Sequence, residues 1–281
     1  MKANSLLAAT LSRGHRVMPR AAGYVHTAMF INTRESEIYP DDLCPLGAHR
    51  VELRDVPRVA AAYVWGGDEP TVLALHGWGS DSSAMSPVIQ AAVAHGESAI
   101  CFDAPGHGVS PGAQATITEY ARATEAVLQR FPSIHTVVAH SLASLAAVAA
   151  VANSDSARVR SVLLMAPACS LSRVLERWAA QRSLPRGVTS LIYRELDRRD
   201  GVPVSHWDIT TLGLPAAVRL RILHDPADDL VPFDDSVVIA AAVAAELQEV
   251  DRGTGHHGIV GSEAMRAALA DCLQTPVEHE R

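Results

Sequence analysis

The chain has 281 residues, enough for one large domain or two small ones. Hydrophobic residues make up 48% of it and charged residues 20%, so it can bury a large core and is not disordered as a whole. The formal net charge of -7 argues against a general nucleic-acid-binding protein, because such proteins carry a basic excess. The four cysteines lie far apart without a C-x-x-C spacing, which argues against a disulfide framework and a structural zinc site.

The start of the chain is similar in composition to a signal peptide. However, its apolar part is brief, Arg13 and Arg16 follow at once, and no small-residue cleavage site closes it. No apolar stretch reaches the roughly 20 residues of a membrane span. We therefore expect a cytoplasmic protein whose residues 1–47 form an N-terminal arm or extra helices.

From about residue 48, apolar runs separated by turn signals predict strands that alternate with helices. The first two strands, 50–53 and 59–64, are expected to form an antiparallel hairpin at the sheet edge. Later strands are predicted over 71–75, 99–102, 136–139, 161–165, 218–223 and 247–250. Helices are predicted over 83–95, 116–130, 142–152, 233–245 and 262–273. This alternation predicts an α/β fold with a mostly parallel central sheet flanked by helices.

One stretch, 169–214, interrupts the alternation. It lacks a strand signal and contains two helix-like segments, 170–182 and 189–199, on either side of a turn at 185–187. Because it is longer than a crossover requires, we interpret it as a helical lid inserted into the core. The alternative is an ordinary pair of connecting helices.

The expected core comprises 48–168 and 215–281. In such sheets, ligands bind beyond the carboxyl ends of the strands. Ser141 lies at one of these ends, in the sequence AHSLA directly before a helix. A serine in a tight strand-to-helix turn projects its hydroxyl away from the sheet. The competing explanation is that Ser141 only caps the helix.

Two further strand ends carry ionisable side chains. Three aspartates follow the strand 218–223 in the sequence DPADDLVP, where a carboxylate can orient a histidine. Turn-forming aspartates give the same pattern. His256 and His257 follow the last strand in the sequence GTGHHG, which predicts a flexible loop able to bring an imidazole over the strand ends.

The order serine, aspartate, histidine, each after a successive strand, is that of the α/β-hydrolase triad. The sequence DAPGHGVS at 103–110 is similar to the D-x-P-G-H-G-x-S loop of that family, and Val231-Pro232 is in register with its D-x-x-V-P motif. Gly255-His256 is similar to its Gly-His pair. Over residues 50–275 the chain resembles the serine hydrolases of the α/β-hydrolase fold.

The resemblance implies that Ser141 is the nucleophile, that His256 takes its proton and passes it to the leaving group, and that Asp228 orients His256. It also implies an oxyanion hole formed by the N–H groups of Trp78 and Leu142. It implies no metal and no cofactor.

Some assignments have alternatives. Asp225 and Asp229 flank Asp228, which alone has the required spacing to Val231-Pro232. His257 could replace His256, and Ser144 is a further serine one helical turn on. We interpret His140 as a packing residue.

The turn around Ser141 departs from the family's Gly-x-Ser-x-Gly pattern. Ala139 and Ala143 stand where that pattern has glycine, and Ala143 adds a methyl group where the turn is tightest.

We expect a hydrolase that cleaves a carboxylic ester or thioester of a small-molecule acyl substrate through an acyl-enzyme. The substrate is expected to lie under 169–214, whose arginines either attract an anionic group or form a solvated helix face. Alternatives are a weakly catalytic binding protein and a lyase or acyltransferase with the same triad. We expect no nucleic-acid partner and no membrane span, and either a monomer or a homodimer.

Overall fold

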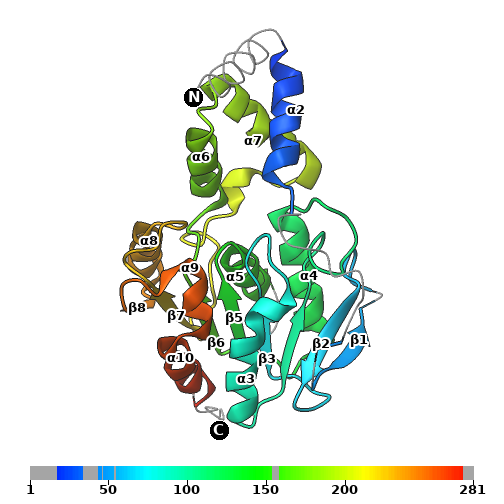
Figure 1. The fold of residues 1–281 in the computed structure, drawn as a ribbon, viewed down its shortest axis with the longest axis vertical. Helices are drawn as coiled ribbons and strands as arrows, with labels where there is room; N and C mark the ends of the chain where they lie inside the picture. Colours follow the sequence, from blue (N-terminus) through cyan, green and yellow to red (C-terminus); the bar gives the residue numbers. More distant parts are fainter. Residues whose placement is uncertain (1–17, 34–43, 46, 54, 154–157, 275–281) are drawn as a thin grey trace.

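An eight-stranded sheet forms the centre of the molecule, in the order β1-β2-β4-β3-β5-β6-β7-β8 (Figure 1). The hairpin of β1 (His49–Glu52) and β2 (Ala61–Trp65) is antiparallel, as is the pairing of β2 with β4. All pairs from β4 to β8 are parallel. The other strands are β3 (Val72–Leu75), β4 (Ala99–Phe102), β5 (Thr136–His140), β6 (Ser161–Met165), β7 (Arg219–His224) and β8 (Glu246–Glu249). The computed structural model describes residues 18–33, 44–45, 47–53, 55–153 and 158–274.

Helices cover both faces of this sheet, and alternate side chains of each strand face opposite layers. On β3, Val72 and Ala74 pack with α3 (Ser86–Ala94) and α10 (Glu263–Leu273). Leu73 and Leu75 belong to the other core layer, which includes helices α4 (Ile117–Arg130), α5 (Ala143–Asn153) and α8 (Phe233–Val243). The predicted class, a mostly parallel sheet flanked by helices, is confirmed.

Helix α5 consists mostly of small side chains. Residues 143–151 of this helix are all buried, and most of them are alanine or valine. Small side chains allow the helix to approach both the sheet and α4 closely. The helix can therefore be enclosed on every side without large gaps.

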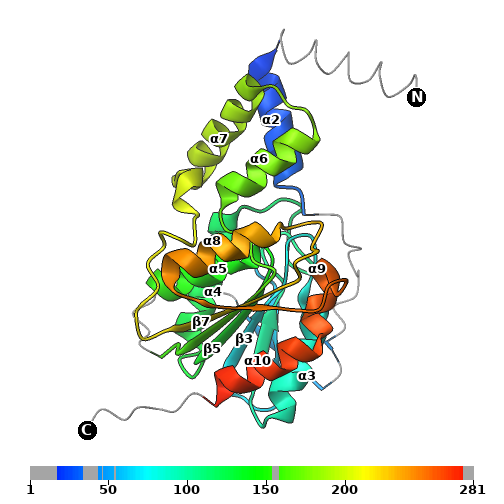
Figure 2. The same ribbon diagram turned by 90° about the vertical axis from the view of Figure 1, so that its left-hand side faces the viewer.

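Three further helices stand together at one end of the molecule, beyond the carboxyl ends of the strands (Figures 1 and 2). They are α2 (Pro19–Phe30), α6 (Leu171–Gln181) and α7 (Arg186–Asp200), and we call them the cap helices. A Cβ atom on Gly23 of α2 would lie 2.5 Å from the Cβ atom of Leu191 on α7, so the glycine allows these two helices to touch.

The cap helices differ from the prediction at one turn. The predicted turn at 185–187 is only partly a turn, because Pro185 precedes α7 and the helix already begins at Arg186. Proline is favoured at a helix start, where its missing N–H is not needed. The segment 1–47, predicted as an N-terminal arm or extra helices, contains α2, and the rest of it falls largely outside the described residues. In the ranges that the structure describes, no helix has the length and apolarity needed to cross a membrane.

Candidate active site

Ser141 lies at the sharp turn between β5 and α5. Its φ angle of 59° is in the left-handed region, which is uncommon for a residue with a side chain. The N–H of Ser141 donates a hydrogen bond to the carbonyl oxygen of Met165 on the neighbouring strand (2.9 Å), which fixes the turn to the sheet. Ala139 and Ala143 are both completely buried, so the turn accommodates their methyl groups. This backbone holds the serine hydroxyl beyond the end of β5.

The structure brings Ser141, His256 and Asp228 into one line of hydrogen bonds. His256 Nε2 lies 2.9 Å from Ser141 Oγ, and His256 Nδ1 lies 2.7 Å from Asp228 Oδ2. Because an ionised carboxylate only accepts hydrogen bonds, Nδ1–H of His256 is the donor to Asp228, and Nε2 is left to accept the serine O–H. This arrangement can remove the serine proton.

The carboxylate of Asp228 has no solvent exposure. Its Oδ1 accepts hydrogen bonds from the N–H groups of Leu230 (2.8 Å) and Val231 (3.0 Å). Burial alone would raise the pKa of Asp228, but hydrogen bonds from His224, from His256 and from the Val231 N–H outweigh it and hold the pKa well below its usual range. Asp228 is therefore a permanent negative charge beside His256.

His224 supports the same carboxylate and was not singled out from the sequence. It is completely buried at the end of β7, with Nε2 3.3 Å from Asp228 Oδ2 and 3.1 Å from the carbonyl oxygen of Val231. The carbonyl contact requires that Nε2 carries the proton, so Nδ1 accepts from the hydroxyl of Ser236 (2.6 Å). Only its place one residue before the aspartates could have indicated this role.

Asp225, which the sequence offered as an alternative to Asp228, contacts the histidine segment in a different way. Its Oδ2 accepts hydrogen bonds from the N–H groups of Gly253 (2.9 Å) and Gly255 (2.8 Å). Hydrogen bonds from Gly255, Ala227 and Gly253 lower the pKa of Asp225. His256 is not in a flexible loop as predicted, because Gly255–Gly258 forms one helical turn, α9. Asp225 thus anchors the backbone directly before His256.

His140 does more than fill space. Its Nε2–H donates to the carbonyl oxygen of His256 (2.8 Å), and the two ring centroids are 4.7 Å apart. Burial, and then the nearby His256, lower the pKa of His140 to about 3, so it acts as a neutral donor. A Cβ atom on Gly77 would lie 2.8 Å from His140 Nδ1 and 3.4 Å from Ser141 Cβ. Glycine at this position therefore lets the segment that leads to Trp78 pass directly beside the serine.

The remaining sequence candidates take no part in the line of hydrogen bonds. Asp229 is exposed. His257 is exposed but lines the cavity, with its ring centroid 5.2 Å from that of His256. Ser144 is completely buried within α5, and its hydroxyl has no hydrogen-bond partner among the described residues. The backbone N–H groups of Trp78 and Leu142 belong to residues that line the same cavity as Ser141.

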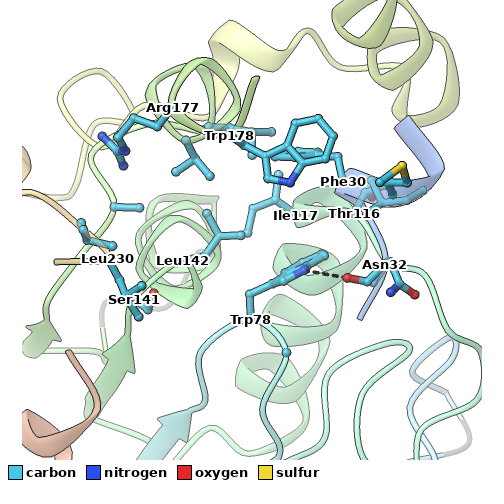
Figure 3. Close-up of a pocket in the computed structure, with 18 of the residues that line it drawn as sticks. Phe30, Asn32, Trp78, Thr116, Ile117, Ser141, Leu142, Arg177, Trp178 and Leu230 are labelled. Atoms are coloured by element: carbon cyan, nitrogen blue, oxygen red, sulfur yellow. Dashed lines mark hydrogen bonds between the residues drawn. The ribbon is translucent and has the colours of Figure 1, made fainter. Parts of the chain in front are cut away.

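A cavity of about 530 Å³ opens onto Ser141 and His256. Figure 3 shows Leu142, Ile117, Trp178 and Phe30 around it, with Ser141 and Thr116 on opposite sides. The indole N–H of Trp78 donates to the carbonyl oxygen of Asn32 (3.3 Å; Figure 3). The N-terminal part of the chain thus contributes directly to the walls of the cavity, which the sequence left undetermined.

Arg173 and Arg177 of α6 do not form a free anion-binding face. Arg173 Nη1 lies 2.9 Å from Asp235 Oδ1, and Arg177 contacts both oxygens of Asp235 (3.1 and 3.0 Å). The Asp235 side chain is 1% exposed and also accepts a hydrogen bond from the N–H of Cys169 (3.1 Å). These contacts join α6 to α8 beside the cavity.

Solved structures with this fold are widespread, whereas no curated protein sequence matches the chain. Alpha/beta hydrolase domain-containing protein 10 from mouse has 18% identity and a TM-score of 0.61, covering 80% of this chain and 96% of that one. An esterase of Pyrococcus furiosus has 19% identity and a TM-score of 0.59, covering 80% and 90%. A serine hydrolase from Cycloclasticus zankles has 14% identity and a TM-score of 0.55, covering 82% and 99%.

At these identities the structural likenesses show a shared fold. The sequence comparison goes further, because the family model described as the alpha/beta hydrolase family matches residues 72–272, which is most of the chain. The matched region contains Ser141, Asp228 and His256 together with six of the eight strands, β3 to β8. The chain belongs to the alpha/beta hydrolase family.

Proposed function

We propose that the protein is a serine hydrolase that cleaves a carboxylic ester or thioester through an acyl-enzyme. The observation that carries this proposal is the unbroken line of hydrogen bonds from Ser141 through His256 to the buried Asp228, at the edge of a cavity. A nucleophile in contact with a base, and a base in contact with an orienting carboxylate, is the arrangement that acyl transfer requires.

In the proposed reaction, Ser141 Oγ attacks the acyl carbon while His256 Nε2 takes the hydroxyl proton. The oxyanion that forms accepts hydrogen bonds from the N–H groups of Leu142 and Trp78, each of which contributes about 3 kcal/mol of transition-state stabilisation. The protonated His256 then gives its proton to the departing alcohol or thiol. Water, deprotonated by His256, releases the acid and restores Ser141.

The cavity supports a small to medium, partly apolar substrate. Its walls include Phe30, Ile117, Leu142, Val174 and Trp178, which offer hydrocarbon and aromatic surface next to the serine. A volume of about 530 Å³ lies in the range of small-molecule sites. The acyl or alcohol part of the ester would lie between the cap helices and the core.

The first test is a panel of p-nitrophenyl esters and acyl thioesters of graded chain length, combined with a serine-directed fluorophosphonate probe. Ser141→Ala is expected to lose turnover by several orders of magnitude and to lose labelling, because the nucleophile is gone. Ser144→Ala is the matched control, since this serine is buried three residues away and is expected to label like the wild type.

Two results would contradict the proposal. Absence of labelling in the wild type would favour a binding protein of the same fold. Labelling without hydrolysis of any ester or thioester would favour an acyltransferase or a lyase that uses the same residues.

A further inference from the structure

The outward face of α2 is apolar. Val25 and Met29, four residues apart and thus on one side of the helix, are 54% and 50% exposed. Tyr24 beside them is 59% exposed, and Met18, directly before the helix, is 63% exposed. We call these four residues the α2 patch. The opposite face of α2, with Gly23, His26 and Thr27, is buried.

This exposure is concentrated rather than scattered. Among the residues that the structure describes, the other large hydrophobic side chains with comparable exposure are Val93, Leu230 and Val237. They belong to three different segments of the chain, and Leu230 lines the cavity. Single exposed apolar residues are ordinary, but a group on one helix face indicates a surface that meets another apolar body.

The charge around the α2 patch is positive, in contrast to the chain as a whole. The paired helices α2 and α7 together contain five arginines and three acidic residues, although the whole chain has a net charge of -7. Arg20 is exposed on α2 itself, and the guanidinium of Arg199 lies 5.4 Å from the centre of the Tyr24 ring. A partner for this face therefore needs both apolar and negatively charged groups.

A second copy of this chain satisfies only half of that requirement. Pairing two α2 patches would cover the apolar side chains, but it would also bring arginines towards arginines, which is unfavourable. A lipid surface with anionic headgroups satisfies both needs, because acyl chains receive the apolar side chains and headgroups receive the arginines.

The α2 patch is also continuous with the cavity. Met29 belongs to the patch and lines the cavity that contains Ser141, together with its neighbour Phe30. We propose that the α2 patch docks on a lipid surface that carries anionic headgroups. Esters dissolved in this surface would then reach Ser141 past Met29. This second step rests on the proposed function, whereas the docking does not.

Vesicle flotation tests the docking. The full-length Ser141→Ala protein, which cannot turn over lipid, is mixed with phosphatidylcholine vesicles with or without phosphatidylglycerol. We expect flotation with the anionic vesicles only, and weaker flotation at high salt. Adding Met18→Glu and Val25→Glu is expected to lower binding at least tenfold, because two inserted side chains become charged.

The control carries Val93→Glu and Val237→Glu, which place the same charges on exposed side chains outside the cap helices. It is expected to float like the parent, and thermal unfolding midpoints check that both double variants are folded. Equal flotation with neutral vesicles, no flotation at all, or equal loss in the control would overturn the proposal. A different result would also overturn it: the parent forms a dimer in light scattering and does not bind vesicles, and the Met18→Glu and Val25→Glu changes abolish the dimer.

The outcome is independent of the catalytic proposal. If the Ser141→Ala protein binds vesicles but the fluorophosphonate probe does not label the wild type, the docking proposal stands and only the hydrolase proposal is rejected. Labelling and ester hydrolysis without flotation would do the opposite.

Discussion

Asp225 and Asp228 lie three residues apart and hold His256 in different ways. Asp228 contacts the imidazole of His256, whereas Asp225 contacts the backbone on either side of Thr254. The sequence predicts the first contact, because the motif spacing singles out Asp228. It cannot predict the second, since that contact depends on how a segment far along the chain returns to β7.

Replacing Asp225 by asparagine is expected to lower kcat for p-nitrophenyl esters about tenfold or more. The amide nitrogen would face a backbone N–H group, so His256 would lose one anchor and its alignment with Ser141. Asp229→Asn is the matched control, because this exposed neighbour lacks a described contact with the histidine segment. Unchanged kcat in Asp225→Asn, at equal stability, would show that the anchor has no effect on the reaction.

The two aspartates also predict how stability depends on pH. The pKa of each carboxyl is lowered in the folded protein, so below about pH 4 the unfolded chain binds more protons than the native one. The stabilisation is present above the unfolded pKa and is lost as the pH falls through the native values. Urea unfolding from pH 7 to pH 2 should show the free energy of unfolding falling in the acid range, with a shallower fall in Asp225→Asn.

At the level of elements, α6 is joined to the core by one buried carboxylate. Asp235 at the start of α8 holds Arg173 and Arg177, and all three lie on elements that the sequence predicted as helices. The pairing itself was not predictable, because the sequence does not show which face of α6 meets α8. The same holds for Trp178, whose ring meets Phe30 of α2 at 5.3 Å between centroids.

Asp235→Asn is expected to destabilise the protein by about 3 kcal/mol, since it removes the charge that two arginines and a backbone N–H share in a buried position. Because Arg177 lines the cavity, KM for the longer esters should also rise. Asp234→Asn provides the comparison. This side chain is 70% exposed, and its ion pair in the described part of the chain is with Arg173, so the loss of its charge should cost less than about 1 kcal/mol. Equal effects of the two changes would argue against a role of the buried Asp235 carboxylate in joining α6 to α8.

For the whole molecule, the strand-helix alternation was sufficient to predict the α/β sheet and the strand ends at which Ser141, Asp228 and His256 lie. An apolar run is a local signal, and the inner strands of this sheet, which are buried throughout, carry it clearly. The position of α2 against α6 and α7 is set by contacts between segments far apart in sequence, such as Gly23 with Leu191, and local patterns carry no information about them. The assignment of 169–214 as a helical lid stays a prediction.

The order of the strands has a consequence for the protein while it is being made. β5, which leads to Ser141, pairs in the middle of the sheet with β3 and β6, whereas β7 and β8 complete the edge. Because the ribosome delivers the chain from its N-terminus, the serine turn can form before Asp228 and His256 have been synthesised. A nascent chain that stops before residue 228 would hold its serine without a base. The chemistry of the site would therefore begin only when the last strands have joined the sheet.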